Sequence, residues 1–307
     1  MNTIVLEKMP DKFWDLVKER NLMSSITPYN DSIDKKKVDA IILRTRIHCD
    51  EDFIDDYPNV KLIIRAGTGF DNIEIEAMKK KGVMVCNTPE ANAQSAFEHT
   101  LALLLAVMKQ LNHARNNVID GKWKSDLDYN LEFEDLKVLV VGVGRIGTKV
   151  ATTLKYLGAE VKGVDPYLTE SEKKLKNIDF INYQDGLKWA NVISYHCPLT
   201  AETFHYFKIE SFKFINKKII LINASRGSVV DEKALLFGLE NRKFIGVGLD
   251  VFENEPTDQG DFIDYQNVFY TPHIGAFTKK AKERMSFETL EVLGKFMKNE
   301  KINSRII

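Results

Sequence analysis

The sequence predicts an α/β protein with two doubly wound parallel sheets, one in each of two domains, and a cleft between the domains. Short β-branched runs alternate with amphipathic stretches through the first ninety residues, and the same alternation restarts at Leu136. The chain of 307 residues is too long for one ordinary core and fits two domains of average size.

The first group of elements is typical of a βα-type unit. Helical patterns at Asp11–Arg20 and Asn72–Lys80 fall between short apolar runs that have the length of buried strands. This alternation predicts a parallel sheet. The predicted strands are Thr3–Leu6, Val38–Leu43, Lys61–Ile64 and Val83–Val85.

A second, longer group of elements follows Leu136. Its helical patterns include Ile146–Leu157, Glu170–Lys176 and Asp231–Leu239. Strands that alternate with such helices predict another doubly wound sheet. The predicted strands are Val138–Val141, Val161–Val164, Val192–Tyr195, Ile219–Ile222, Phe244–Leu249 and Val268–Tyr270.

Residues 96–118 connect the two groups. The stretch from Leu101 to Met108 is apolar nearly all round, so a helix here must be covered on more than one side. Ser95 and Glu98 have the spacing of a capping box at its start. A buried core helix would explain the pattern by itself.

Composition excludes several classes of function. The formal net charge is −1, so no overall field recruits nucleic acid or an anionic membrane, and the lysine-rich stretches have acidic residues close by. The three cysteines are widely separated and form neither a disulfide framework nor a metal-ligand spacing, so we expect no bound metal and a reducing, cytoplasmic compartment. Met1–Pro10 lacks the apolar core of a signal peptide, and no run of 18 apolar residues occurs.

A glycine-rich loop indicates a dinucleotide site. Gly142, Gly144 and Gly147 come directly after a β-branched strand and directly before a helical pattern. Asp165 ends the next strand, where a carboxylate can accept both ribose hydroxyls but repels a 2′-phosphate. The pattern therefore predicts NAD rather than NADP, although Asp165 could also be a turn residue before Pro166.

Three short segments in the last third of the chain supply an arginine, a carboxylate and a histidine. They contain Arg226, Glu255 and His273, each after an apolar run and bounded by Gly or Pro. Oxidation of a hydroxyl to a carbonyl needs such a set: a cation for the substrate's anion, a proton carrier, and a group that tunes the carrier.

These motifs together resemble the NAD-dependent D-2-hydroxyacid dehydrogenases, and among them most the D-3-phosphoglycerate dehydrogenases. The resemblance implies a flavodoxin-like substrate-binding domain made of residues 1–94 and 281–307, with Lys279–Met297 as a returning helix, and a Rossmann-like NAD-binding domain of residues 95–280. The substrate domain is then discontinuous. It also implies a homodimer that forms through residues 96–118.

The resemblance assigns roles to the chemical groups. Arg226 is expected to bind the substrate carboxylate, His273 to carry the proton, and Glu255 to hold the imidazole and stabilise its charged form. Glu253 is an alternative to Glu255. Asp250 is expected to bind the nicotinamide carboxamide, whereas His196 only packs. The residues expected to contact NAD are Gly142, Gly144, Arg145, Ile146, Gly147, Asp165, Pro198, Ala224, Asp250 and Gly275.

The substrate end is expected in the first domain. Arg65 ends a strand before the glycine-rich turn Gly67-Thr68-Gly69, whose N–H groups can cradle an anion, and Arg44 and Arg46 follow the neighbouring strand. Three cations in a chain without net positive charge suggest a substrate with a second anionic group, such as a phosphate. Exposed arginines after strands are common, which leaves a plain structural explanation open.

The leading hypothesis is oxidation of D-3-phosphoglycerate to 3-phosphohydroxypyruvate, which serves serine biosynthesis. Another D-2-hydroxyacid is the alternative, for example in a glyoxylate or 2-oxoacid reductase. A third possibility is an NAD-sensing corepressor without turnover. Many phosphoglycerate dehydrogenases add a C-terminal regulatory domain, and because this chain ends at Ile307 we do not expect feedback through one.

Overall fold

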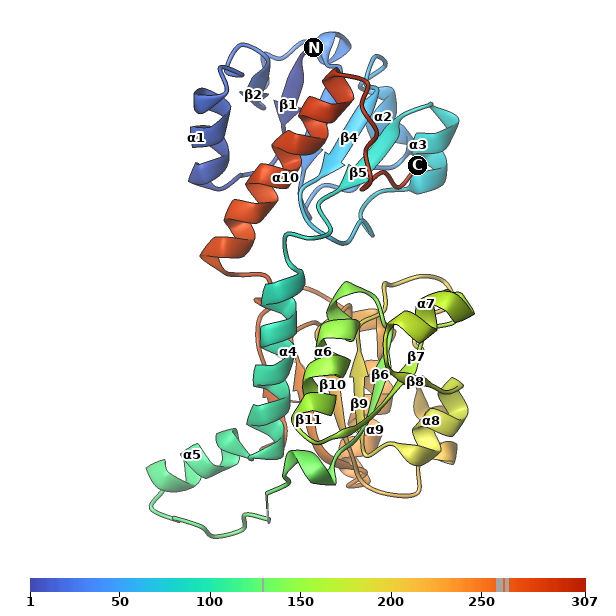
Figure 1. The fold of residues 1–307 in the computed structure, drawn as a ribbon. Helices are drawn as coiled ribbons and strands as arrows, with labels where there is room; N and C mark the ends of the chain where they lie inside the picture. Colours follow the sequence, from blue (N-terminus) through green and yellow to red (C-terminus); the bar gives the residue numbers. More distant parts are fainter. Residues whose placement is uncertain (129, 258–261, 263–264) are drawn as a thin grey trace. The chain divides into compact units, whose positions relative to one another are not determined.

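The computed structural model describes residues 1–128, 130–257, 262 and 265–307. The chain divides into two compact units, each with its own sheet (Figure 1). The first unit comprises Met1–Ser95 and Ala276–Ile307, and the second comprises Ala96–Gly275. No described helix is both long enough and apolar enough to span a membrane.

The sheet of the first unit has five parallel strands in the order β2-β1-β3-β4-β5. This is the flavodoxin-like order, in which the strand sequence reverses beside β1. The strands are β1 (Thr3–Val5), β2 (Ile26–Pro28), β3 (Ala40–Leu43), β4 (Leu62–Arg65) and β5 (Met84–Asn87).

Helices cover both faces of this sheet (Figure 1). Successive strand residues point to opposite faces, so Ile42 and Ile64 pack with one set of helices while Ile41 and Ile63 pack with the other. The first face is covered by α1 (Asp11–Glu19) and α10 (Lys279–Met297), and the second by α2 (Glu51–Asp55) and α3 (Ile75–Lys80), with the short 3-10 turn η1 (Lys35–Lys37) before β3.

The returning helix α10 has the predicted bounds. Thr278 caps it by accepting a hydrogen bond from the backbone N–H of Ala281 at 3.1 Å. The chain after it then runs beside β5, where the N–H of Ile306 donates to the carbonyl of Val85 at 2.8 Å. The last residues therefore complete the core of the first unit.

The sheet of the second unit has seven parallel strands in the order β12-β11-β10-β9-β6-β7-β8. This is the Rossmann order, and the strand sequence reverses between β6 and β9. The strands are β6 (Lys137–Val141), β7 (Glu160–Val164), β8 (Asp179–Phe180), β9 (Val192–Tyr195), β10 (Ile219–Asn223), β11 (Phe244–Leu249) and β12 (Val268–Tyr270).

Two clusters of buried side chains lie on the two faces of this sheet. Val138 and Ile220 pack with α4 and α6, whereas Leu139 and Leu221 pack with α8 and α9. The helices are α4 (Ala93–Met108), α5 (Leu111–Ile119), α6 (Arg145–Tyr156), α7 (Glu170–Leu175), α8 (Tyr183–Trp189) and α9 (Glu232–Glu240), with 3-10 turns η2 (Phe133–Asp135), η3 (Ile209–Phe214) and η4 (Gly227–Val229). The doubly wound fold predicted from the sequence is confirmed.

The predicted capping box before residue 96 is wrong. Helix α4 already begins at Ala93, so Ser95 lies inside the first turn and cannot serve as the N-cap. The good helix former Ala93 extends the helix past the predicted start. The stretch also does not continue as one helix to Val118, because Gln110 has a left-handed backbone (φ 50°) and separates α4 from α5.

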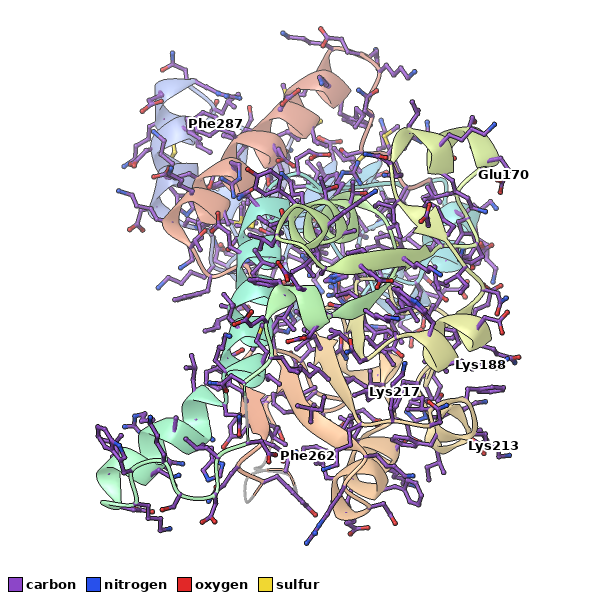
Figure 2. All side chains as sticks on the ribbon, turned by 60° about the horizontal axis from the view of Figure 1, so that its bottom comes forward. Glu170, Lys188, Lys213, Lys217, Phe262 and Phe287 are labelled. Carbon is purple, nitrogen blue, oxygen red and sulfur yellow. The ribbon has the colours of Figure 1, made fainter. Side chains whose placement is uncertain are left out.

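The lysine-rich stretches carry paired rather than isolated charge. Lys35 lies 2.6 Å from Asp56, and Lys81 pairs with Asp55. In the second unit Lys188 extends into solvent from α8 and lies 2.8 Å from Asp185 (Figure 2). These pairs agree with the absence of a strong overall field predicted from the net charge.

Candidate active site

The glycine loop after β6 requires glycine at two positions. Gly142 has φ +89°, and a Cβ there would lie 2.6 Å from the backbone nitrogen of Cys197. A Cβ on Gly147 would lie 2.0 Å from the carbonyl oxygen of Gly142. The loop can therefore approach β9 and pack under α6 only with glycine at both positions.

Gly144 differs from the other two glycines. It is the N-cap residue of α6, and no described atom lies within 4 Å of the position that its Cβ would take. Arg145 and Ile146 begin the helix, so the N–H groups of its first turn and its positive dipole end face this open side. An anionic diphosphate fits this arrangement.

Asp165 lies at the carboxyl end of β7 and contacts the glycine loop. Its Oδ2 accepts a hydrogen bond from the N–H of Val143 at 2.9 Å, and its Oδ1 accepts one from the N–H of Tyr167 at 3.1 Å. The carboxylate thus has a turn-forming role, and it also stands at the point where a Rossmann fold holds the adenosine ribose.

Other residues expected near NAD also follow the carboxyl ends of strands. Pro198 comes after β9, and Ala224 comes directly after β10. His196 is half-buried and its Nε2 lies 2.8 Å from the hydroxyl of Ser194. Burial lowers the pKa of His196 to about 4. His196 is therefore neutral at pH 7 and held by Ser194.

The turn after β10 presents Arg226. The side-chain oxygen of Asn223 accepts hydrogen bonds from the N–H and hydroxyl of Ser225, at 3.1 and 2.8 Å, and its amide nitrogen donates to the carbonyl of Arg226 at 2.9 Å. A Cβ on Gly227 would lie 1.9 Å from the carbonyl carbon of Phe252. The Arg226 turn is therefore closed by Asn223 and pressed against the segment that leads to Glu255.

Glu255 and His273 form a direct pair. Nδ1 of His273 lies 2.5 Å from Oε2 of Glu255, while Oε1 of Glu255 accepts a hydrogen bond from the N–H of Phe252 at 3.1 Å. Burial raises the pKa of Glu255, but the hydrogen bonds, the charge of His273 and the nearby Arg226 outweigh it, so the pKa is lowered. Glu253 instead lies 3.0 Å from His205.

Asp250 is an almost fully buried carboxylate that holds the turn carrying His273. It accepts hydrogen bonds from the N–H of Ile274 at 2.8 Å, the N–H of Gly275 at 2.7 Å and the hydroxyl of Thr271 at 2.6 Å. Burial raises its pKa, yet the bonds from His99, Thr271 and the backbone outweigh burial and lower the pKa.

His99 of α4 is a member of this network that the sequence did not reveal. Its Nε2 lies 3.1 Å from Oδ1 of Asp250 and 2.9 Å from the hydroxyl of Thr271. A single histidine on a helix just before an apolar run has no distinctive sequence pattern. The only feature of the sequence that could have indicated its role is its polarity on a helix that is otherwise apolar nearly all round.

In the first unit, the predicted substrate arginines follow two neighbouring strands. Leu43 of β3 pairs with Arg65 of β4, so Arg44 and Arg46 follow the strand next to Arg65. The two carboxylate oxygens of Glu7 accept the N–H groups of residues 44–46, which fastens that turn. Its backbone donors are therefore already used, and any anion must be bound by side chains.

The turn of residues 67–69 depends on Gly67. The residue has φ +148°, and a Cβ there would lie 1.6 Å from Nη1 of Arg65. Asn87 donates to the carbonyl of Thr68 at 2.6 Å, and Asn72 donates to the carbonyl of Arg44 at 3.1 Å. Asn72 thus joins the segments that follow β3 and β4, and Asn87 fastens the turn of residues 67–69 to β5.

Comparison with known proteins decides the family. Residues 101–275 match the model of the D-isomer specific 2-hydroxyacid dehydrogenase, NAD binding domain. A crystal structure of D-lactate dehydrogenase from Aquifex aeolicus complexed with NAD and lactic acid is 30% identical, with 97% of this chain and 96% of that chain covered and a TM-score of 0.86. The chain belongs to the D-isomer specific 2-hydroxyacid dehydrogenase family.

Other relatives are named for one particular substrate. The D-3-phosphoglycerate dehydrogenase of Bacillus subtilis is 35% identical over 268 residues, which is 87% of this chain and 51% of the relative. That of Methanocaldococcus jannaschii is 33% identical over 266 residues, again with 51% of the relative covered. The chain thus spans about half the length of the curated relatives that it matches.

The different roles of Gly144 and Gly147 in the glycine loop can be tested with two substitutions. Gly144→Ala places its methyl in open space, so we expect normal folding but roughly tenfold weaker NADH binding, equal to ~1.4 kcal/mol. Gly147→Ala is overpacked against Gly142 and should lower stability by ~1–3 kcal/mol. NADH fluorescence titration and thermal unfolding measure the two effects, and equal behaviour of both variants would contradict the assigned geometry.

The Asp250 network predicts a pH-dependent stability. Because the pKa of Asp250 is lowered on folding, its contribution is complete above the unfolded value of about 3.9 and is lost as the pH falls below it. Asp250→Asn should therefore cost ~1–3 kcal/mol at pH 7 and less at pH 3. Thermal unfolding of both proteins at the two pH values checks this, and a difference that grows in acid would refute it.

Proposed function

We propose that the protein is an NAD-dependent dehydrogenase that interconverts a D-2-hydroxyacid and its 2-oxoacid, with D-3-phosphoglycerate as the substrate. The observation that carries the proposal is the Glu255–His273 pair, with the Arg226 turn closed against the segment before Glu255. Arg226, Glu255 and His273 follow the strands β10, β11 and β12. These strands belong to the same sheet as β6, which the glycine loop follows.

The residues after these strands fit NAD. The open Gly144 and the start of α6 suit its diphosphate, and the Asp165 carboxylate suits an unphosphorylated ribose. Gly275, fixed by Asp250, would border the nicotinamide end together with Ala224. When bound, NAD accepts the hydride from C2 of the hydroxyacid or returns it to the 2-oxoacid.

The protein's own groups would then bind the substrate and move the proton. The Arg226 guanidinium binds the substrate carboxylate through two parallel hydrogen bonds and stays charged at any working pH. With Nδ1 of His273 held by Glu255, Nε2 is the nitrogen that takes the proton from the substrate hydroxyl and returns it in reduction. The ionised Glu255 stabilises the imidazolium that forms.

The arginines of the first unit support a substrate with a second anionic group. We propose that Arg44, Arg46 and Arg65 bind the phosphate, because they follow adjacent strands and the backbone donors around Arg44 are already used by Glu7. The names of the curated relatives point the same way. A smaller D-2-hydroxyacid is the second candidate, since the similar A. aeolicus structure is a D-lactate dehydrogenase.

A homodimer through residues 96–118 is part of the proposal. This segment exposes apolar side chains to solvent in the single chain, with Leu111 and Val118 exposed by 52% and 62%, and Ile119 directly after it is exposed by 65%. Exposed apolar groups favour burial against another protein surface. The cytoplasmic location stays a prediction, in keeping with three buried cysteines without disulfides.

The substrate can be identified with a panel of 2-oxoacids in the presence of NADH. Phosphohydroxypyruvate should be reduced with the highest kcat/KM, ahead of pyruvate and glyoxylate. In Arg46→Met, its KM should rise roughly 10- to 100-fold through loss of a charge-assisted hydrogen bond, while the KM of pyruvate stays unchanged. An equal effect on all three would remove the phosphate assignment, and turnover of none would favour an NAD-sensing protein.

Replacement of Glu255 tests the proton carrier. Reduction requires protonated His273, and Glu255→Gln removes the charge that stabilises it. The alkaline limb of the pH–rate profile for 2-oxoacid reduction should therefore move to lower pH. Glu253→Gln should leave the limb where it is in the unmodified enzyme, because Glu253 pairs with His205 and it is Glu255 that pairs with His273. If the limb moves only in the Glu253 variant, Glu253 rather than Glu255 stabilises the protonated His273.

A further inference from the structure

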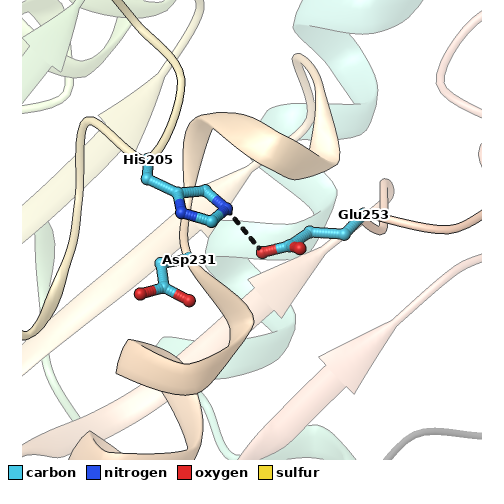
Figure 3. A group of neighbouring side chains, drawn as sticks. All are labelled: His205, Asp231 and Glu253. Carbon is cyan, nitrogen blue, oxygen red and sulfur yellow. Dashed lines mark ion pairs between the residues drawn. The ribbon is translucent and has the colours of Figure 1, made fainter.

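A second histidine–carboxylate group lies in the NAD-binding unit and has no part in the proposed reaction. His205, Asp231 and Glu253 come from three separate segments and lie side by side, with His205 and Glu253 facing each other and the Asp231 carboxylate turned away from them (Figure 3). Their nearest nitrogen and oxygen atoms all lie within 4.8 Å of one another. Metal ligands are brought together in proteins in this way, from segments far apart in sequence.

His205 is held in place with one nitrogen directed at this centre. Its backbone has a left-handed conformation (φ 49°), its N–H donates to the carbonyl of Ser228 at 2.8 Å, and its ring stacks on Phe204. Nε2 is buried and lies 3.0 Å from Oε1 of Glu253, but no hydrogen bond satisfies it among the described residues. The nearby oxygen is close without being in line with the nitrogen.

That arrangement suits two ligands of one ion better than a donor and its acceptor. Nitrogen and oxygen atoms bound to the same Zn²⁺ at ~2.0–2.2 Å stand ~3.0–3.6 Å apart, with the ion on the nitrogen lone pair and the oxygen to one side. The His205–Glu253 separation already has this value. The widest pair of the group must close by roughly 1 Å, which a partly exposed Asp231 side chain can do by rotation.

The two carboxylates are oriented by backbone donors. Oε1 of Glu253 accepts the N–H of Glu232 at 2.9 Å, and Oδ1 of Asp231 accepts the N–H of Lys233 at 2.9 Å. A carboxylate oxygen has two lone pairs, so these bonds leave acceptor capacity for an ion. The bond from Glu232 thus keeps Glu253 in the orientation of a metal ligand, whereas Asp231 must rotate to reach the ion.

We propose that His205, Asp231 and Glu253 bind a divalent transition-metal ion of the Zn²⁺ or Co²⁺ class. One imidazole and two carboxylates carry a charge of −2 that the ion would neutralise, and the imidazole selects transition metals over Mg²⁺ and Ca²⁺. Water would fill the remaining positions. The proposal does not depend on the reaction at His273.

The position of the site indicates a structural effect. Glu253 lies two residues before Glu255, and Asp231 caps the helix α9 that follows the Arg226 turn through η4. An ion here would join the segment that presents Glu255 to the segment after Arg226. We therefore expect bound metal to raise thermal stability, because it binds the folded chain and not the unfolded one.

The test uses the full chain after treatment with a chelator. Titration with Co²⁺ should show visible d–d absorption that saturates at one equivalent, and Zn²⁺ should displace it. His205→Ala should abolish this binding. Asp231→Asn keeps a good N-cap for α9, and Glu253→Gln keeps an acceptor for the N–H of Glu232, so each should weaken binding while the protein remains folded.

Two control variants separate the site from other histidines. His48 lies 3.6 Å from Glu74 and belongs to no described group of three ligands, so His48→Ala should bind one equivalent as before. His273→Asn should do the same. Absence of binding in the unmodified protein, or the same binding in His205→Ala, would overturn the proposal, and the group would then be an ion pair that fastens the start of α9.

Discussion

The candidate site depends on the buried carboxylate of Asp250. Burial of such a group without partners would cost several kcal/mol, so its oxygens must find donors. They find them in His99, Thr271 and two N–H groups of the turn that follows β12. The path of that turn is thereby fixed, including the left-handed backbone of His273 at φ 51°. The strained backbone of His273 is thus maintained by the hydrogen bonds of Asp250, although His273 itself makes none of these bonds.

Contacts within and between loops also position Arg226 and Glu255. The Arg226 turn is closed by Asn223 from within and by the close contact of Gly227 with Phe252 from outside, while Phe252 donates its N–H to Glu255. A cation and a carboxylate from different strands are therefore positioned through one shared segment. Loops at the carboxyl edge of a parallel sheet can carry reactive groups because the sheet beneath them is rigid.

Much of the fold could be predicted because buried strands and helices leave a local pattern of apolar residues in the sequence. The strands β9, β11 and β12 begin and end where the apolar runs predict, and α10 has the predicted bounds. The strands β2 and β8 were missed because one contains Pro28 and the other has two residues, too short for a periodic pattern. The partners of the site were missed for another reason. Glu7, Asn72 and His99 act through contacts to residues far away in sequence, and no spacing rule announces such contacts.

The two histidine–glutamate pairs show how similar side chains acquire different chemistry. Glu253 and Glu255 are two residues apart and reach different histidines. At His273 the side chain is 44% exposed and its other ring nitrogen can meet a substrate, so the pair suits a proton carrier. At His205 a second carboxylate stands close by, and Glu253 is already bonded to the start of α9. The second carboxylate favours a cation at the centre over a mobile proton, and this difference in surroundings separates the proposed catalytic pair from the proposed metal site.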